Sequence, residues 1–281
     1  MKAGAEILEV SIQAAKTKAS GSTIKLIVLG ILAGAFIAFA AEGSNMGAFN
    51  LLAKADTYGL GKAIAGVIFP TGLMLVIIAG GELFTGNTLM IGGVVRREIT
   101  LGAMLRNWGI VYASNLVGAL LIACMMSTSG LFHSGGDLLG AVTLKIAAGK
   151  TALPFDSALV LGIMCNWLVC LAVWFSFASS SISGKILGIF FPIWLFITSG
   201  FEHSVANMYY IPAGILAKNS ENYVQAAQNI GVTDAALEGL TWQGFFVNNL
   251  IPVTLGNIIG GCLFVSLAYY VSYRKKKEPV I

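Results

Sequence analysis

Six long stretches of the sequence contain no charged residue, and they limit what the chain can fold into. An α-helix needs about 20 apolar residues to cross the hydrocarbon core of a bilayer. The uncharged stretches are 26–41, 63–81, 107–136, 157–184, 186–201 and 239–273. Only 11% of the residues are charged, whereas soluble domains carry about 25%. The sequence therefore predicts an all-α membrane protein with six transmembrane helices.

Two glutamates interrupt the uncharged stretches at matching places. Glu82 in "GELFTGN" and Glu202 in "FEHSVAN" lie five residues before Asn87 and Asn207. Backbone at membrane depth can be irregular only where protein or a water-filled cavity satisfies its polar groups. We therefore expect the second and fifth helices to be broken here. In one interpretation the carboxylates and amides only brace the resulting loops. In the other, one or both carboxylates gain and lose a proton during transport.

The second half of the chain resembles the first. The block "GILAGAFIAFA", which starts at Gly30, matches "GIMCNWLVCLA", which starts at Gly162. Two asparagines eight residues apart in "NWGIVYASNLVGALL" match two in "NNLIPVTLGNIIGGCL". Each unit holds three spans, an odd number, so the second unit enters the membrane from the opposite side. The sequence thus predicts an inverted repeat, as in many transporters, with units 24–126 and 156–273.

Positive charge is unevenly distributed between the predicted loops. With the N-terminus inside, twelve lysines and arginines lie on the cytoplasmic side and five on the outer side, Lys54, Lys62, Lys145, Lys150 and Lys218. The positive-inside rule places both termini in the cytoplasm. We expect residues 1–22 to form a cytoplasmic amphipathic helix, residues 23–273 the six-span domain and residues 274–281 a basic cytoplasmic tail. No cleavable signal peptide is expected.

Several other functions are disfavoured by the residues. The tail "RKKK" abuts a membrane span, which argues against a nucleic-acid partner. The four cysteines lack the spacing of metal ligands. A haem-binding anchor would need at least two histidines in the spans, where only His203 is found. His203 and Ser204 lack the surroundings of a serine nucleophile, so no enzyme is expected. A channel for neutral solutes fits the inverted repeat, but the paired Asn-Pro-Ala motifs of that class are absent.

Three segments carry a resemblance to a known family. "GGELFTGN", "FEHSVANMYYIP" and "NNLIPVTLGNIIGG" resemble the signature segments of the formate/nitrite transporter family, and the resemblance covers residues 5–273. It implies a homopentamer of six-span protomers in the inner (plasma) membrane, each with an aquaporin-like repeat, its own pore and no cofactor. The implied function is passive or proton-coupled transport of small monovalent anions. Formate is the main expectation, and nitrite and hydrosulfide are the alternatives.

The resemblance also implies roles for single residues. Thr85 matches a loop threonine that faces the pore, His203 a histidine at mid-membrane, and Lys150 a lysine of the outer segment between spans three and four. The two apolar constrictions of the family are matched by Phe69, Leu73, Leu83 and Phe196. Its two pore-lining asparagines are matched by Asn166 and Asn257. One departure is Glu82, because the formate-channel branch carries aspartate there. This difference bears on which branch of the family the chain belongs to, rather than on its fold.

Each polar residue of this set has two interpretations. His203 either is a hydrogen-bonded structural residue, or donates to the anion or passes it a proton. Thr85 is either a second donor opposite His203 or a helix cap. Lys150 is either a loop lysine or a lure that raises the local anion concentration.

The apolar residues likewise form either plain core or a gate that excludes water. A bare anion would lose its hydration in such a gate at a large cost. That cost favours crossing as the neutral acid, which requires a proton at the pore.

Overall fold

The computed structural model describes residues 2–274, and six of its helical segments are long and apolar enough to cross a membrane. These candidate spans are Thr23–Leu52, Tyr58–Gly80, Leu101–Thr128, Phe155–Ala178, Ile182–Ser199 and Gly244–Tyr273. The prediction of an all-α membrane protein with six spans is therefore confirmed. All of the predicted basic tail except Arg274 lies outside the described residues.

The second span is interrupted at the first glutamate. The helical segments of this half are α1 (Gly4–Ala19), α2 (Thr23–Leu52), α3 (Tyr58–Ile68), α4 (Pro70–Met74), the π-helical η1 (Leu75–Gly80), α5 (Phe84–Asn87), the 3-10 turn η2 (Thr88–Met90), α6 (Ile91–Val95) and α7 (Leu101–Thr128). Gly80 ends η1 with a φ of +97°, which favours glycine. Residues 81–83 are non-helical, and a short apolar helical segment follows over Phe84–Val95.

The fifth span is interrupted in the same way. This half contains the 3-10 turn η3 (Leu131–His133), α8 (Leu138–Thr151), α9 (Phe155–Ala178), α10 (Ile182–Ser199), α11 (Ser204–Ala217), α12 (Glu221–Asn229), α13 (Asp234–Gly239), the π-helical η4 (Gly244–Leu250), α14 (Ile251–Gly261), the π-helical η5 (Cys262–Leu267) and α15 (Ala268–Tyr273). Gly200, with a φ of +79°, ends α10. Residues 201–203 are non-helical before α11 begins. Both predicted breaks are confirmed.

Two helix pairs, α2 with α7 and α9 with α14, make the most extensive contacts of the bundle. A methyl group added to Gly34 would lie 2.1 Å from the carbonyl oxygen of Asn115. One added to Gly256 would lie 2.2 Å from the carbonyl oxygen of Leu159. Only glycine permits backbones to approach this closely. The close approach brings the asparagines of α7 and α14 next to the two breaks.

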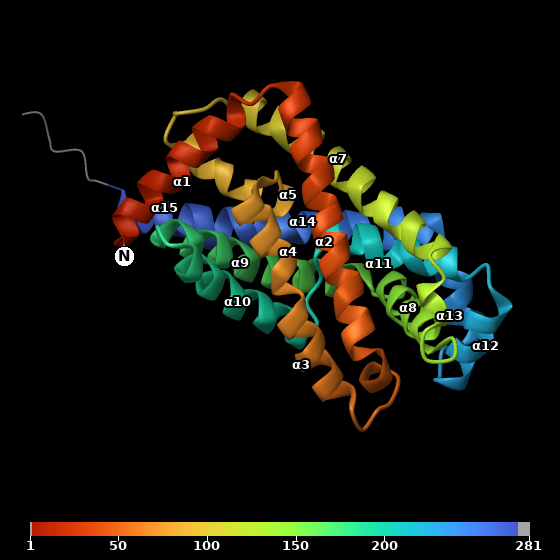
Figure 1. Ribbon diagram of the computed structural model, residues 1–281. Coiled ribbons are helices and arrows are strands. Elements are labelled where there is room, and N and C mark those ends of the chain that lie inside the picture. Colours follow the sequence, from red (N-terminus) through yellow and green to blue (C-terminus); the bar gives the residue numbers. More distant parts are fainter. Residues whose placement is uncertain (1, 275–281) are drawn as a thin grey trace, which may run out of the picture.

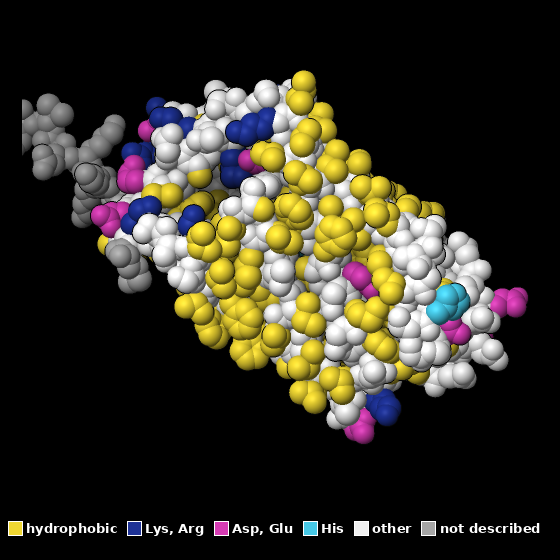
Figure 2. Space-filling view, viewed as in Figure 1, with side chains coloured by type: hydrophobic (Ala, Val, Ile, Leu, Met, Phe, Trp, Pro, Cys, Tyr) yellow, Lys and Arg dark blue, Asp and Glu magenta, His cyan; other side chains and the backbone are white. Residues whose placement is uncertain are grey.

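Helix α1 lies across the end of the molecule that also carries α15 (Figure 1). Its buried residues pack against the protein itself, and Ile7, Leu8, Ile12 and Ala15 are among them. Lysine and arginine side chains gather at this end, whereas hydrophobic side chains cover much of the visible flank (Figure 2). This distribution is typical of a membrane protein whose flank faces lipid or another subunit.

Three lysines that the sequence placed in outer loops lie in helices instead. Lys62 belongs to α3, and Lys145 and Lys150 belong to α8. The hydropathy pattern missed this because a lysine can stay in a helix and extend its ammonium group to a polar space along its apolar stem.

Candidate functional site

Two cavities lie on opposite sides of the broken segments. The first, which we call the α1-side cavity, has a volume of about 210 Å³, and its lining includes Lys18, Leu73, Leu83, Gly86 and Asn87. The second, the α8-side cavity, has a volume of about 430 Å³, and its lining includes Asn45, Lys62, Lys150, Phe196, Glu202 and His203. Each cavity therefore receives residues from one of the two loops.

A hydrogen bond between Thr85 and His203 joins the two broken spans. The Nε2 atom of His203 lies 2.8 Å from the Oγ1 atom of Thr85, and both side chains are buried. His203 lines the α8-side cavity. Thr85 lies between Leu83 and Gly86, which line the α1-side cavity. The Thr85–His203 pair thus connects the walls of the two cavities.

The second ring nitrogen of His203 fixes where the proton of the neutral ring lies. The backbone N–H of Ala206 donates to Nδ1 at 3.1 Å, so His203 caps the N-terminus of α11. A nitrogen that accepts a hydrogen bond carries no proton. The neutral ring is therefore protonated on Nε2, which donates to Thr85. Thr85 is not itself a cap, because Leu83 occupies the N-cap position of α5.

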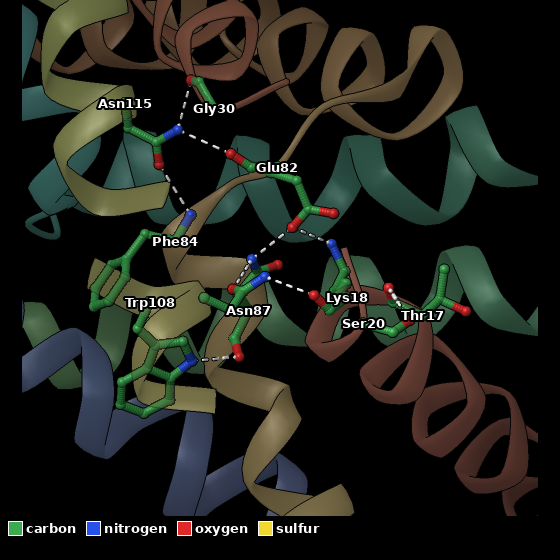
Figure 3. A network of polar contacts seen from close by, with 10 residues as sticks. Thr17, Lys18, Ser20, Gly30, Glu82, Phe84, Asn87, Trp108 and Asn115 are labelled. Atoms are coloured by element: carbon green, nitrogen blue, oxygen red, sulfur yellow. Dashed lines mark hydrogen bonds and ion pairs between the residues drawn. The ribbon is translucent and has the colours of Figure 1, made fainter. Parts of the chain in front are cut away.

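The first loop is held by a polar network around Glu82 (Figure 3). The Nδ2 atom of Asn87 donates to the Glu82 carboxylate at 2.7 Å and to Oδ1 of Asn107 at 2.8 Å. The ammonium of Lys18 lies 2.9 Å from the same carboxylate oxygen. Asn107 in turn donates to the backbone carbonyl of Lys18 at 3.2 Å. The network therefore connects the loop to α7 and to α1.

Asn115 of α7 satisfies the backbone of the same loop. Its Oδ1 accepts from the N–H of Phe84 at 3.0 Å, and its Nδ2 donates to the carbonyls of Gly30 and Glu82 at 2.8 and 2.9 Å. Glu82 donates its own N–H to the carbonyl of Leu29. The backbone groups that the break releases are thus bonded inside the protein, as membrane depth requires.

The second loop repeats these contacts. The Nδ2 atom of Asn207 donates to the Glu202 carboxylate at 2.6 Å and to Oδ1 of Asn249 at 2.7 Å. The ammonium of Lys150 lies 2.7 Å from the carboxylate. Asn249 donates to the backbone carbonyl of Lys150 at 2.9 Å. Each of these contacts has a counterpart in the first loop, and Lys150 corresponds to Lys18.

The backbone of the second loop is satisfied in the same manner. Oδ1 of Asn257 accepts from the N–H of Ser204 at 2.9 Å, and its Nδ2 donates to the carbonyls of Gly162 and Glu202 at 2.8 and 3.0 Å. Asn166 donates to the carbonyls of Thr85 and Asn257. Neither Asn166 nor Asn257 is among the residues that line the two cavities. Their amides hold the loops in place.

The four apolar residues of the predicted constrictions divide between the two sides. The rings of Phe69 and Phe196 meet edge to face with centroids 5.6 Å apart, and Phe196 lies 6.0 Å from the ring of His203. Leu73 and Leu83 line the α1-side cavity. All four side chains are buried. Apolar side chains therefore lie close to the Thr85–His203 pair on both sides.

The sequence from residue 5 to residue 271 matches the family model described as "Formate/nitrite transporter". The chain belongs to this family. The match confirms the resemblance noted in the sequence, and the family is one of transporters rather than enzymes. The protein is thus a multi-pass membrane transporter of the formate/nitrite family.

Several relatives of known name cover nearly the whole chain. The chain is 41% identical over 266 residues to "Probable formate transporter" of Methanothermobacter thermautotrophicus, with 90% of each chain covered. It is 37% identical over 280 residues to "Formate channel FocA" of Escherichia coli (strain K12), with 98% of this chain and 95% of that one covered. A solved structure described as "Pentameric formate channel with formate bound" superposes with a TM-score of 0.78 at 36% identity, and covers 90% of this chain and 98% of that one.

Sequence reasoning missed two parts of the site of this transporter. It counted Lys18 only as a topology signal, although Lys18 lies twelve residues before Gly30, just as Lys150 lies twelve residues before Gly162. That spacing could have revealed the correspondence. It also overlooked Lys62 and Asn45, whose positions in the α8-side cavity follow from packing and have no signal in the sequence.

Proposed function

We propose that the protein is a channel for small monovalent anions and that formate is its main substrate. The observation that carries the proposal is the Thr85–His203 hydrogen bond, which lies where the walls of the two cavities meet. The names of the similar proteins support formate as the substrate. Nitrite and hydrosulfide remain the alternative substrates, because the same donors would serve them.

In this proposal the α8-side cavity opens to the outside and the α1-side cavity to the cytoplasm. The excess of lysine and arginine at the α1 end supports this orientation. Both termini would then lie on the cytoplasmic side of the plasma membrane. Five protomers would assemble, each with its own pore, as the description of the similar solved structure suggests.

The apolar residues near the pair would make passage of a bare anion costly. An anion that reaches His203 would accept the Nε2–H of the ring in place of Thr85, and the Thr85 hydroxyl could donate beside it. Protonation of His203 at Nδ1 would remove the acceptor of the Ala206 N–H and uncap α11. We therefore propose that His203 acts first as a hydrogen-bond donor. To pass a proton to the substrate, the ring would first have to be protonated at Nδ1 and lose its capping hydrogen bond with Ala206.

Reconstitution tests the proposal directly. Proteoliposomes containing the purified protein should take up formate faster than protein-free vesicles, with a rate that depends on the imposed pH gradient. Parallel measurements with nitrite and hydrosulfide would rank the three anions, and glycerol-driven swelling would test the neutral-solute alternative. Formate uptake no faster than in protein-free vesicles would contradict the proposal. Native mass spectrometry of the same sample should give a pentamer, and a monomer or tetramer would contradict that part.

A further inference from the structure

The α8-side cavity carries a positive charge that its own residues do not compensate. Its lining includes three lysines, Lys62, Lys145 and Lys150, and one carboxylate, Glu202. Lys150 is bonded to Glu202 at 2.7 Å, so these two charges neutralise each other. Lys145 donates to the carbonyl of Leu52 at 3.3 Å. Lys62 forms neither an ion pair nor a side-chain hydrogen bond with residues 2–274.

A hydrogen-bond donor without a partner lies in the same cavity. Asn45 is 2% exposed and lines the cavity, and its Nδ2 has no hydrogen-bond partner among the described residues. A buried amide donor that finds no acceptor in its own protein costs free energy. We take the cavity as the source of the missing acceptor, because Asn45 belongs to its lining.

Packing of α2 on α3 brings Lys62 and Asn45 toward each other. Ser44, which precedes Asn45, donates to the carbonyl of Ala65 at 3.0 Å, and Ala65 lies about one helical turn after Lys62. The ammonium of Lys62 lies 3.9 Å from the position that a methyl group on Gly200 would take. Gly200 ends α10 and leads into the loop of His203. The free ammonium is therefore close to the entrance of the loop.

We infer that Lys62 and Asn45 form a second anion-binding site in the α8-side cavity, which binds a small monocarboxylate before it reaches Phe196 and His203. The inference rests on the proposed function, because it concerns the same substrate. A carboxylate has two oxygens, so one can accept from the ammonium and the other from the Asn45 amide. A cationic site at the mouth of a pore also raises the local concentration of anions. The site would thereby act as the lure that the sequence analysis gave as one of two interpretations of Lys150.

Equilibrium exchange of labelled formate across proteoliposomes tests this site, because exchange does not depend on how the protein is oriented. In Lys62→Met, the half-saturating formate concentration should rise about tenfold, the effect of losing one charge-assisted hydrogen bond. The maximum exchange rate should change little, because the site lies outside the apolar constriction. Lys62→Arg keeps the charge and should stay near wild type. Lys54→Met is the matched control, since Lys54 is exposed and is not part of the cavity lining.

A second variant keeps the test valid if Lys62→Met does not assemble. Asn45→Asp retains the shape of the side chain but replaces the donor with a negative acceptor, so it should also raise the half-saturating concentration. Exchange by wild type together with wild-type saturation in Lys62→Met and Asn45→Asp would overturn the inference and leave the proposed function intact. Absence of exchange by wild type would instead overturn the proposed function, and the inference with it.

Discussion

His203 and Thr85 lie 118 residues apart in the chain and form a 2.8 Å hydrogen bond that joins the two broken spans. The same imidazole caps α11 through its other nitrogen. The ring therefore has a structural role and faces the α8-side cavity at the same time. A substitution at this position must separate the two roles to be informative.

Asparagine and phenylalanine at position 203 achieve that separation. Asparagine is a good N-cap and retains an N–H donor, but it cannot carry a proton near neutral pH. We expect His203→Asn to assemble, to lose the pH dependence of formate uptake and to allow some passive anion leak. His203→Phe removes donor and cap, and its uptake driven by a proton gradient should fall to that of protein-free vesicles. If His203→Asn kept the wild-type pH dependence, the proton would have to come from water or from Glu202.

The two ion pairs at the loops should differ in their contribution to stability. The side chains of Lys150 and Glu202 are 15% and 6% exposed, against 26% and 10% for Lys18 and Glu82. Loss of one partner from a buried ion pair costs about 3–5 kcal/mol, and exposure reduces that cost. Lys150→Met should therefore lower the melting temperature in detergent more than Lys18→Met does. The double variant Lys150→Met/Glu202→Gln should recover part of the loss, and equal losses in both single variants would contradict the difference in burial.

Leu83 should limit the size of the substrate on the α1 side. It is 3% exposed and lines the α1-side cavity two residues before Thr85. Leu83→Ala widens this path, so acetate and lactate should enter proteoliposomes faster relative to formate. Leu144→Ala removes an equally buried leucine of α8 that is not part of either cavity lining, and it should keep the wild-type selectivity. Unchanged selectivity in Leu83→Ala would move the constriction elsewhere.

Helix contact at Gly34 should be intolerant of even one methyl group. The added carbon would lie 2.1 Å from the carbonyl oxygen of Asn115, which belongs to the backbone of α7. Gly34→Ala should therefore lower the melting temperature and disturb the loop that Asn115 holds. Gly109→Ala is the matched control, because it also lies on this helix pair but has open space around it. That variant should be neutral or slightly stabilising, since alanine favours a helix over glycine by roughly 1 kcal/mol.

The contact between α1 and Glu98 should depend on pH. A hydrogen bond and charge interaction with Lys16, with a smaller contribution from Arg96, lower the pKa of Glu98. A carboxyl whose pKa is lowered by folding stabilises the docked helix above its unfolded pKa, and this stabilisation is lost as the pH falls through the folded pKa. The protection of the α1 amides against hydrogen exchange, relative to their intrinsic exchange rate at each pH, should therefore be high at pH 7 and fall below about pH 4. In Glu98→Gln this part of the pH dependence should disappear, and an unchanged profile would show that Glu98 does not hold α1.

The spans and their breaks could be predicted because hydropathy and burial of charge act locally along the chain. The end of the first span could not be predicted in this way. The uncharged stretch stops before Glu42, whereas α2 continues to Leu52. Glu42 is buried and accepts a hydrogen bond from the hydroxyl of Tyr209, which follows it by 167 residues. A charged residue therefore marks the end of a span only if no distant partner satisfies it.

The site was predictable to a similar extent. Thr85 and His203 could be named from the resemblance of their segments to the family, but their mutual hydrogen bond depends on how the two halves pack. Lys62 was assigned to a loop because a lysine near the end of a span has the same local pattern as a loop lysine. The role that we infer for Lys62 rests on Lys150 being neutralised by Glu202, which only the spatial arrangement reveals.

The partners of the two loops have a consequence for biosynthesis. Glu82 and Asn87 leave the ribosome before Asn107 and Asn115, and Glu202 and Asn207 leave it before Asn249 and Asn257. Each loop therefore waits for the last span of its own half before its backbone groups and its asparagine side chain are fully hydrogen-bonded. A nascent chain halted between a loop and its asparagines would hold unpaired polar groups beside lipid. Membrane insertion of each half should thus be completed by its third span, and the half-made protein should be a preferred target for degradation.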